Sequence, residues 1–309
     1  MSYKFSKVKR MKIVNIHPNI TAFYFGADSP TPESQSKEID WVNDACLNLG
    51  VASYAIHKDG ECIVIDTLCS LEQAEKVKSV LIEQFNVTRL AVVLSHWHLH
   101  HIGGNAAYKN HDLISTRGTR EYLEDLKPGI ESGTSSWGPP PIPEVFLPNI
   151  VFDDTLKIYV SDMEVELRRL NIHSDDSLYL YIPSLKTLFA GDMVEDTIPF
   201  ISNPDSIKEH IENYKELSAL DVEKVLPNHC RLDALLDGGY PKEIIDSTCF
   251  YLSALRDLVM AGNSHFPGVE ELMSGYIESN VITYWPPYEK VHLSNIDKLL
   301  KLYQESLLE

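Results

Sequence analysis

The sequence predicts an α+β fold in which two mixed β-sheets pack against each other and helices cover the outside. Short apolar runs that contain β-branched residues and are bounded by turn residues predict strands in both halves of the chain. Longer segments with one apolar face predict helices between and after these strands. The resulting order is strands, helix, strand, helices, strands, helix, strand, helices. This order fits two packed sheets better than a single parallel sheet.

The first half of the chain predicts strands on either side of one amphipathic helix. Strands are expected at residues 11–25 (one or two strands), 51–56, 62–65 and 90–94. Asp59-Gly60 lies between the second and third of these segments and is a typical hairpin turn. Apolar positions in residues 71–85 fall on one face, which predicts a helix. Residues 28–36, rich in Ser, Pro and acidic side chains, predict a surface loop.

The second half predicts a further set of strands and most of the helices. A short helix is expected over residues 119–126, with Thr119 as its N-cap. Residues 129–148, rich in Gly and Pro, predict an irregular loop. Strands are then expected at residues 156–160, 165–170, 178–182, 187–190 and 222–226. Further helices are expected at residues 204–220, 244–260 and 269–309, the last interrupted by Trp285-Pro286-Pro287.

The composition is that of a soluble globular protein. Hydrophobic residues make up 44% and charged residues 23% of the 309 residues, which suits one large domain or two. No apolar stretch approaches the roughly 18 residues of a transmembrane helix, and residues 1–10 lack the apolar core of a secretory signal. The five cysteines are odd in number and form no C-x-x-C pair, so we expect reduced thiols and a cytoplasmic location.

The charge balance limits the partners of the protein. The chain has 27 basic and 45 acidic residues, a formal net charge of −18. Such a surface repels phosphate backbones and anionic lipids, so we expect neither a nucleic acid nor a membrane as a partner. We expect a small-molecule substrate instead.

Four histidines lie in one hexapeptide directly after the apolar run at residues 90–94. The hexapeptide is His96-Trp97-His98-Leu99-His100-His101. Imidazole is the commonest protein ligand for metals, and it suits zinc, copper and iron better than magnesium or calcium. A pH-sensitive surface patch or an accident of composition is the alternative. The placement on a loop at a strand end favours a metal site.

Three further strand ends also present metal-binding side chains. His173, Asp192 and His229 each follow a short predicted strand. Any one of them alone would more often be a cap or a structural residue, but four strand ends that all carry donors indicate a shared site. Asp66 ends another predicted strand, and it is either a loop cap or an acceptor for the N–H of a ligating imidazole.

This ordered set of donors resembles the metallo-β-lactamase-fold hydrolase superfamily over about residues 11–232. The pattern of that family is H-x-H-x-D-H, then a distant His, an Asp after a Gly, and a last His. The matching residues here are His96, His98, His101, His173, Asp192 and His229. The resemblance implies an αββα sandwich with the site at one edge. It also divides the chain into a catalytic domain (1–232) and a mainly helical C-terminal extension (233–309), which closes over the site, forms a homodimer contact or is inert.

The resemblance also implies how the donors are shared between two metal ions. The first ion takes the residues that match His96, His98 and His173. The second takes those that match His101 and His229, together with the Asp of the first motif. The residue that matches Asp192 bridges both ions in many members. We expect two zinc ions, with iron or manganese as alternatives.

One residue departs from the family pattern. His100 stands where the family has the Asp of its first motif. Three consequences are open: His100 is a nitrogen ligand of the second ion, or the second site is weak or empty, or the side chain points away from a degenerate site. We favour two bound ions. If His100 is not a ligand, it is a candidate proton shuttle.

These observations together predict a metal-dependent hydrolase of a small-molecule ester, lactone, thioester or amide. A divalent metal lowers the pKa of bound water from about 15.7 to about 7, which provides hydroxide at neutral pH. Asp192 and His100 are the candidate catalytic residues beside the ligands. Two rivals remain open: a di-iron redox enzyme on the same fold, and a catalytically idle binding protein that kept the scaffold.

Overall fold

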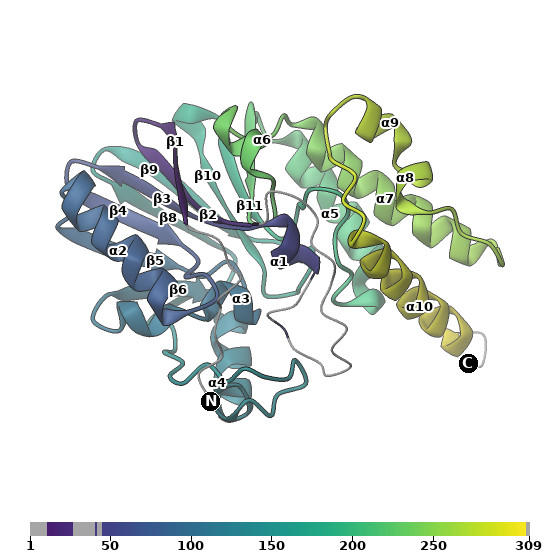
Figure 1. The fold of residues 1–309 in the computed structure, drawn as a ribbon, viewed down its shortest axis with the longest axis horizontal. Coiled ribbons are helices and arrows are strands. Elements are labelled where there is room, and N and C mark those ends of the chain that lie inside the picture. The colour runs from purple at the N-terminus through teal and green to yellow at the C-terminus, as the bar shows by residue number, and fades with distance from the viewer. Residues whose placement is uncertain (1–10, 27–40, 42–44, 307–309) are drawn as a thin grey trace.

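The expected fold is confirmed by the computed structural model, which describes residues 11–26, 41 and 45–306. Two mixed sheets of seven and five strands share one hydrophobic core, and helices lie on the outside (Figure 1). The loop expected at residues 28–36 and the N-terminal residues 1–10 lie outside the described residues, as does the side chain of Cys46.

The seven-stranded sheet runs in chain order from β1 to β7. Its strands are β1 (Lys12–His17), β2 (Ile20–Phe25), β3 (Val51–Lys58), β4 (Glu61–Ile65), β5 (Arg89–Val93), β6 (Asp112–Thr116) and β7 (Ile150–Phe152). Neighbouring strands are antiparallel from β1 to β4 and parallel from β4 to β7. Because parallel strands end at the same edge of a sheet, β4 and β5 deliver the residues that follow them to one place.

The hairpin between β3 and β4 forms as the sequence predicts. Asp59 and Gly60 both have positive φ, 50° and 80°, as the favoured two-residue hairpin turns require. The side chains of β4 then alternate between two cores. Ile63 faces the core shared with the second sheet, whereas Val64 faces the core covered by helices.

The five-stranded sheet has the order β12-β11-β10-β9-β8. Its strands are β8 (Thr155–Val160), β9 (Met163–Arg169), β10 (Leu178–Ile182), β11 (Thr187–Gly191) and β12 (Lys224–Pro227). The strands β8 to β11 are antiparallel, and β12 joins the edge parallel to β11. The ends of β11 and β12 therefore lie side by side, which matters for the site.

Helices cover both sides of the paired sheets. They are α1 (Ala45–Leu49), α2 (Leu71–Phe85), α3 (Leu99–Ile102), α4 (Arg117–Ser132), α5 (Ile207–Ala219), α6 (Leu232–Leu236), α7 (Glu243–Met260), α8 (Val269–Leu272), α9 (Ser274–Glu278) and α10 (Tyr288–Ser306). The helix α2 spans the predicted residues, and Ser70 is its N-cap, because its hydroxyl accepts the N–H of Gln73. The helices α5, α7 and α10 lie at the opposite end of the molecule from α2 (Figure 1).

The helix expected over residues 119–126 is longer than predicted and has a different cap. Thr116, not Thr119, is the N-cap of α4, because its hydroxyl accepts the backbone N–H of Thr119 at 3.1 Å. The helix continues to Ser132 and stops at Gly133, which has a φ of 71°. The first part of the loop expected at 129–148 is therefore helical.

Strand β6 was not predicted, because its local signal is short. Only Leu113 and Ile114 are apolar in its five residues. The strand forms because it fills the place between β5 and β7, where parallel neighbours on both sides bury it. The pairing with β5 and β7, rather than the local sequence of β6, therefore makes this segment a strand.

The C-terminal helices share a core with the sheets. Tyr251 of α7 and Tyr288 of α10 belong to the same apolar cluster as Phe189 of β11. The domain boundary proposed at residue 232 stays a prediction. Within the described residues, no helix is both long and apolar enough to cross a bilayer.

Candidate metal centre

The four clustered histidines follow β5 and are all buried. The chain leaves β5, turns at Ser95 and enters the short helix α3 at Leu99. The exposed fractions of the four histidines lie between 0% and 6% (His96, His98, His100 and His101). The alternative of a pH-sensitive surface patch is therefore wrong.

Asp66 holds this turn in place from the end of the neighbouring strand. Its carboxylate accepts the backbone N–H and the hydroxyl of Ser95, both at 2.7 Å. The same carboxylate lies 3.0 Å from Nδ1 of His101 and accepts the side-chain amide of Asn228. Of the two roles left open for Asp66, the structure shows both, since its carboxylate caps the loop at Ser95 and contacts an imidazole of the histidine loop. The latter contact leaves Nε2 of His101 as the nitrogen that faces inward.

Three loops of the second sheet bring the remaining donors to the same place. His173 lies between β9 and β10 with a φ of 69°, an unusual conformation for a residue with a side chain. Asp192 follows β11, and His229 follows the parallel strand β12. Gly191 has a φ of 56°, and a Cβ there would lie 3.2 Å from Cβ of Ser95. This glycine thus lets the loops of the two sheets approach closely.

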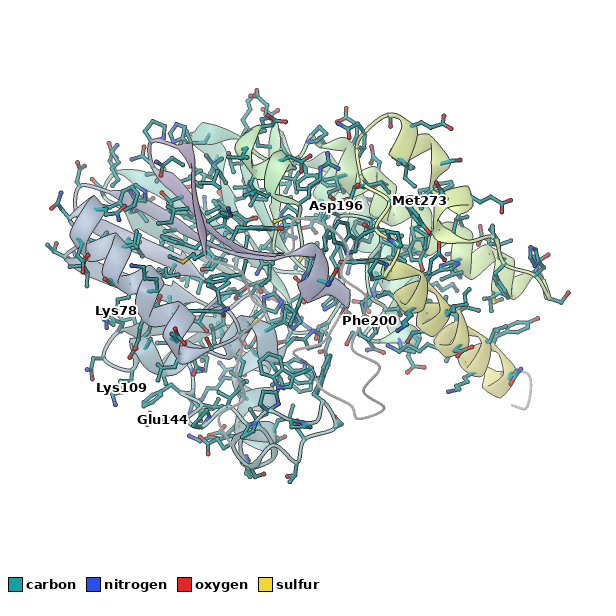
Figure 2. All side chains as sticks on the ribbon, viewed as in Figure 1. Lys78, Lys109, Glu144, Asp196, Phe200 and Met273 are labelled. Atoms are coloured by element: carbon teal, nitrogen blue, oxygen red, sulfur yellow. The ribbon has the colours of Figure 1, made fainter. Side chains whose placement is uncertain are left out.

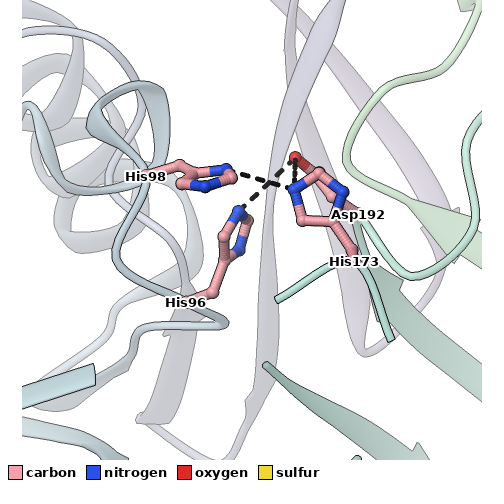
Figure 3. Close-up of side chains that lie close together, drawn as sticks. All are labelled: His96, His98, His173 and Asp192. Atoms are coloured by element: carbon pink, nitrogen blue, oxygen red, sulfur yellow. Dashed lines mark hydrogen bonds and ion pairs between the residues drawn. The ribbon is translucent and has the colours of Figure 1, made fainter. Parts of the chain in front are cut away.

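A first donor group consists of His96, His98, His173 and Asp192 (Figure 3). Nδ1 of His98 lies 3.1 Å from Nε2 of His173. Oδ2 of Asp192 lies 3.6 Å from Nε2 of His96 and 3.8 Å from Nε2 of His173. The side chains come from three separate loops and point toward a common centre (Figure 3).

A second donor group shares the same aspartate and contains His100, His101 and His229. Oδ2 of Asp192 lies 3.4 Å, 3.0 Å and 3.3 Å from Nε2 of these three histidines, respectively. Nε2 of His100 is also 2.9 Å from Nε2 of His229. His100 therefore points into the cluster, and the alternative in which it points away is wrong.

The donor atoms fit metal ions. Within each group the ligand atoms all lie within 4.8 Å of one another, as one ion would require. Nε2 of His96 and Oδ1 of Asp192 are buried and have no hydrogen-bond partner, although buried polar atoms are nearly always paired. Imidazole nitrogens with one carboxylate form a donor set that suits zinc or iron. No cysteine belongs to either group in the described part of the chain.

The histidines of the site differ in their affinity for protons, even within the second group. Burial and the neighbouring imidazoles lower the pKa of His100 to about 4, and burial lowers the pKa of His173 to about 3. Burial by itself would lower the pKa of His101 and His229 as well. The negative charge of Asp192 raises the pKa of both by more than burial lowers it, and the charge of Asp66 raises that of His101 further. The pKa of His101 rises to about 10 and that of His229 to about 9. An ion that binds the second group must displace these protons.

Several residues that support the site were not predicted. Ser95 and Asn228 each precede a donor in the sequence, and Glu195 follows Asp192 by three residues. Oε1 of Glu195 lies 3.8 Å from Nδ1 of His173. Ser202 has no local signal at all, and its hydroxyl lies 3.4 Å from Nε2 of His98. The only sequence signal that could have identified any of these residues is a polar side chain next to a donor, as at Ser95 and Asn228.

Aromatic side chains flank the first group on the side of His98. The ring centroids of Trp97 and Trp137 each lie 4.8 Å from that of His98. Trp97 also stacks on Tyr122, with 5.6 Å between centroids. Trp285 takes no part in this cluster, since its indole N–H donates to Asn48 at 3.1 Å.

Comparisons with known proteins agree with this geometry. The sequence pattern of the Metallo-beta-lactamase superfamily matches residues 48–229, more than half of the chain. That range contains every donor of both groups. A comparison with curated proteins found no match.

Solved structures of low sequence identity share the fold. A metallo-beta-lactamase from Pontibacter korlensis is 15% identical, with a TM-score of 0.55 over 74% of this chain and 96% of that chain. One from Hirschia baltica is 14% identical, with a TM-score of 0.56 over 79% and 98%. One from Erythrobacter litoralis, with beta mercaptoethanol in its active site, is 12% identical, with a TM-score of 0.55 over 80% and 100%.

Proposed function

Because this chain belongs to the metallo-beta-lactamase superfamily, we propose that it is a metal-dependent hydrolase of a small-molecule ester, lactone, thioester or amide. One observation carries the proposal. A single carboxylate oxygen, Oδ2 of Asp192, lies 3.0–3.8 Å from imidazole nitrogens of five histidines drawn from both donor groups. This is the arrangement expected of a ligand shared by two ions.

The donor set favours two zinc ions, with iron or manganese as alternatives. His96, His98 and His173 would hold the first ion, and His100, His101 and His229 the second, with Asp192 shared. When bound, such ions lower the pKa of water and polarise a carbonyl or phosphoryl oxygen. The inward position of His100 supports its role as a nitrogen ligand rather than as a remnant.

The chain itself would supply orientation and a suitable environment. Asp66 fixes the ring of His101, and Asp192 lies between the two donor groups. Both carboxylates are buried. Trp97 and Trp137 offer apolar surface beside His98, which favours a substrate with an apolar acyl group.

The net charge of −18 argues against polyanions such as nucleic acids or anionic membranes as partners. The odd cysteine count favours a reducing, cytoplasmic location.

Metal content and hydrolysis test this proposal together. Protein purified without added metal is expected to contain two equivalents of zinc and to hydrolyse members of an ester, lactone and thioester panel. A chelator should remove both the metal and the activity, and added zinc should restore both. Hydrolysis that persists in fully metal-free protein would refute the proposal.

The same preparation separates the two rival functions. Two equivalents of iron, visible absorption and oxygen consumption would indicate a di-iron redox enzyme. Tight binding of panel compounds without turnover would indicate an idle binding protein. Colourless protein that turns over an ester excludes both.

Variants of His100 test the departure from the family pattern. His100→Ala should lose about one equivalent of zinc and most hydrolytic activity, because the second group loses a nitrogen while the first keeps all of its histidines. His100→Asp should keep two equivalents, since a carboxylate replaces the imidazole. Elemental analysis after dialysis measures both. Two tightly bound ions in His100→Ala would show that His100 is not a ligand.

A further inference from the structure

The loop that follows Asp192 is held in place by the C-terminal helix α10. Asn295 of that helix is fully buried, and its side-chain oxygen accepts the backbone N–H of Ile201 at 2.9 Å. Its side-chain nitrogen donates to the carbonyl of Pro199 at 2.8 Å and lies 3.1 Å from the hydroxyl of Tyr251. One amide group thus satisfies two backbone groups of the loop and is itself anchored to α7.

Lys298, one turn further along α10, holds the same loop. Its ammonium group donates to the carbonyl of Ile201 at 2.6 Å and lies 3.5 Å from the centre of the Phe200 ring. Residues three apart on a helix share a face, so Asn295 and Lys298 act on the loop together. Figure 2 shows Phe200 between the sheets and the C-terminal helices.

The beginning of the loop is also tied to the C-terminal segment. Oδ1 of Asp196 accepts the backbone N–H of Thr283 at 2.7 Å. The hydroxyl of Thr197 donates to the carbonyl of the same residue at 2.8 Å. Asp196 is fully buried and is labelled near the C-terminal helices in Figure 2. Residues 196–201 are therefore fixed from outside at both ends.

On its inner side this loop faces the outward nitrogens of two histidines of the first group. The hydroxyl of Ser202 lies 3.4 Å from Nε2 of His98. Glu195 accepts the backbone N–H of Phe200 at 3.1 Å, but it lies 3.8 Å from Nδ1 of His173, which has no hydrogen-bond partner among the described residues. The contact with Ser202 therefore makes His98 the histidine that this loop can orient. A partner on the outer ring nitrogen selects which nitrogen is free to face a metal ion.

The second group does not depend on this loop for its outward contacts. Nδ1 of His101 faces Asp66, and Nδ1 of His229 lies 3.3 Å from the carbonyl of Gly50. Both partners come from the first sheet or the residues beside it. The partners of these ring nitrogens are thus separate from those of the first group. In the described part of the chain, the loop touches the second group only through its backbone, where the N–H of Asp196 donates to the carbonyl of His229 at 3.1 Å.

We propose that Asn295 is a positioning residue for the first donor group, acting through residues 199–202 on His98. The C-terminal helix lies outside the residues that match the family pattern, yet it is part of the metal centre. This inference rests on the proposed binding of metal by both groups. It assigns the C-terminal segment a role in metal affinity rather than that of an inert extension.

The experiment measures zinc affinity of each group separately, by competition with a chromophoric chelator. His100→Ala weakens the second group and reports on the first, whereas His96→Ala weakens the first and reports on the second. Asn295→Ala is expected to lower zinc affinity about 10- to 100-fold in the His100→Ala background, as loss of a partner behind a ligand typically does. It should leave zinc affinity unchanged in the His96→Ala background.

Two further measurements distinguish positioning from a general loss of stability. Val291→Ala truncates a buried side chain of the same helix that makes none of these hydrogen bonds, and it should change neither affinity. The ring ¹⁵N signals of His98 should show mixed tautomers in Asn295→Ala and a single tautomer in Val291→Ala. If Asn295→Ala does not fold, Lys298→Met takes its place, because it removes the hydrogen bond to the carbonyl of Ile201 but keeps the apolar part of the side chain. It should lower zinc affinity in the His100→Ala background and leave it unchanged in the His96→Ala background.

Equal losses in both backgrounds, or no loss in either, would overturn the positioning role while leaving the proposed hydrolase intact. Failure of the unmodified protein to bind zinc at all would overturn both proposals. The two failures are therefore distinguishable.

Discussion

Asp192→Asn is expected to release both metal ions and to abolish hydrolysis. Oδ2 of Asp192 faces both donor groups, so one substitution weakens both. The amide has almost the same shape but lacks the negative charge that balances two dications. The loss of metal affinity should exceed the roughly 10- to 100-fold effect of removing a residue behind a ligand. Elemental analysis after dialysis and the hydrolysis panel measure the result.

A nearby carboxylate provides the control for Asp192. Asp175 accepts the hydroxyl of Tyr122 at 3.0 Å and belongs to neither donor group. Asp175→Asn should therefore keep two equivalents of zinc and the full rate. An Asp192→Asn protein that keeps both ions and hydrolyses its substrate would remove the observation on which the proposed function depends.

Asp66→Ala is expected to lower the free energy of unfolding by about 3–5 kcal/mol, the usual result of breaking a buried charged pair. The substitution leaves the buried N–H and hydroxyl of Ser95 without their acceptor, and it frees the ring of His101 and the amide of Asn228. Unsatisfied buried donors cost roughly 1–3 kcal/mol each. Chemical denaturation of the metal-free protein measures the change.

The same substitution should weaken the second group more than the first. His101 would lose the contact that fixes its tautomer, whereas the outward nitrogens of His98 and His173 face Ser202 and Glu195 instead. Zinc affinity in the His96→Ala background should therefore fall. The exposed Asp153, which pairs with Arg117 at the surface, offers the control, since Asp153→Ala should change stability by less than about 1 kcal/mol. A loss that small for Asp66→Ala would contradict this account.

Local signals explain the parts of the fold that were predicted well. The Asp59-Gly60 turn and the apolar face of residues 71–85 depend only on near neighbours in the chain. The cap of α4 was misplaced because Thr116 and Thr119 are both plausible caps, and only the hydroxyl contacts of the folded chain distinguish them. Strand β6 carries too few apolar residues to be recognised before its neighbours are known.

The sequence alone determined the donor types and their order, because each donor follows a short strand signal that depends on neighbouring residues. The expectation of two donor groups came from the resemblance of this ordered set to a known family. The sequence left open where His100 points and what holds the ligands in place. Tertiary structure decided both: Asn228 contacts Asp66, Ser202 contacts His98, and Asn295 contacts Ile201, although the two residues of each pair are at least 94 positions apart in the sequence. Hydrogen bonds between such distant residues depend on how the two sheets and α10 pack, and no local pattern encodes that packing.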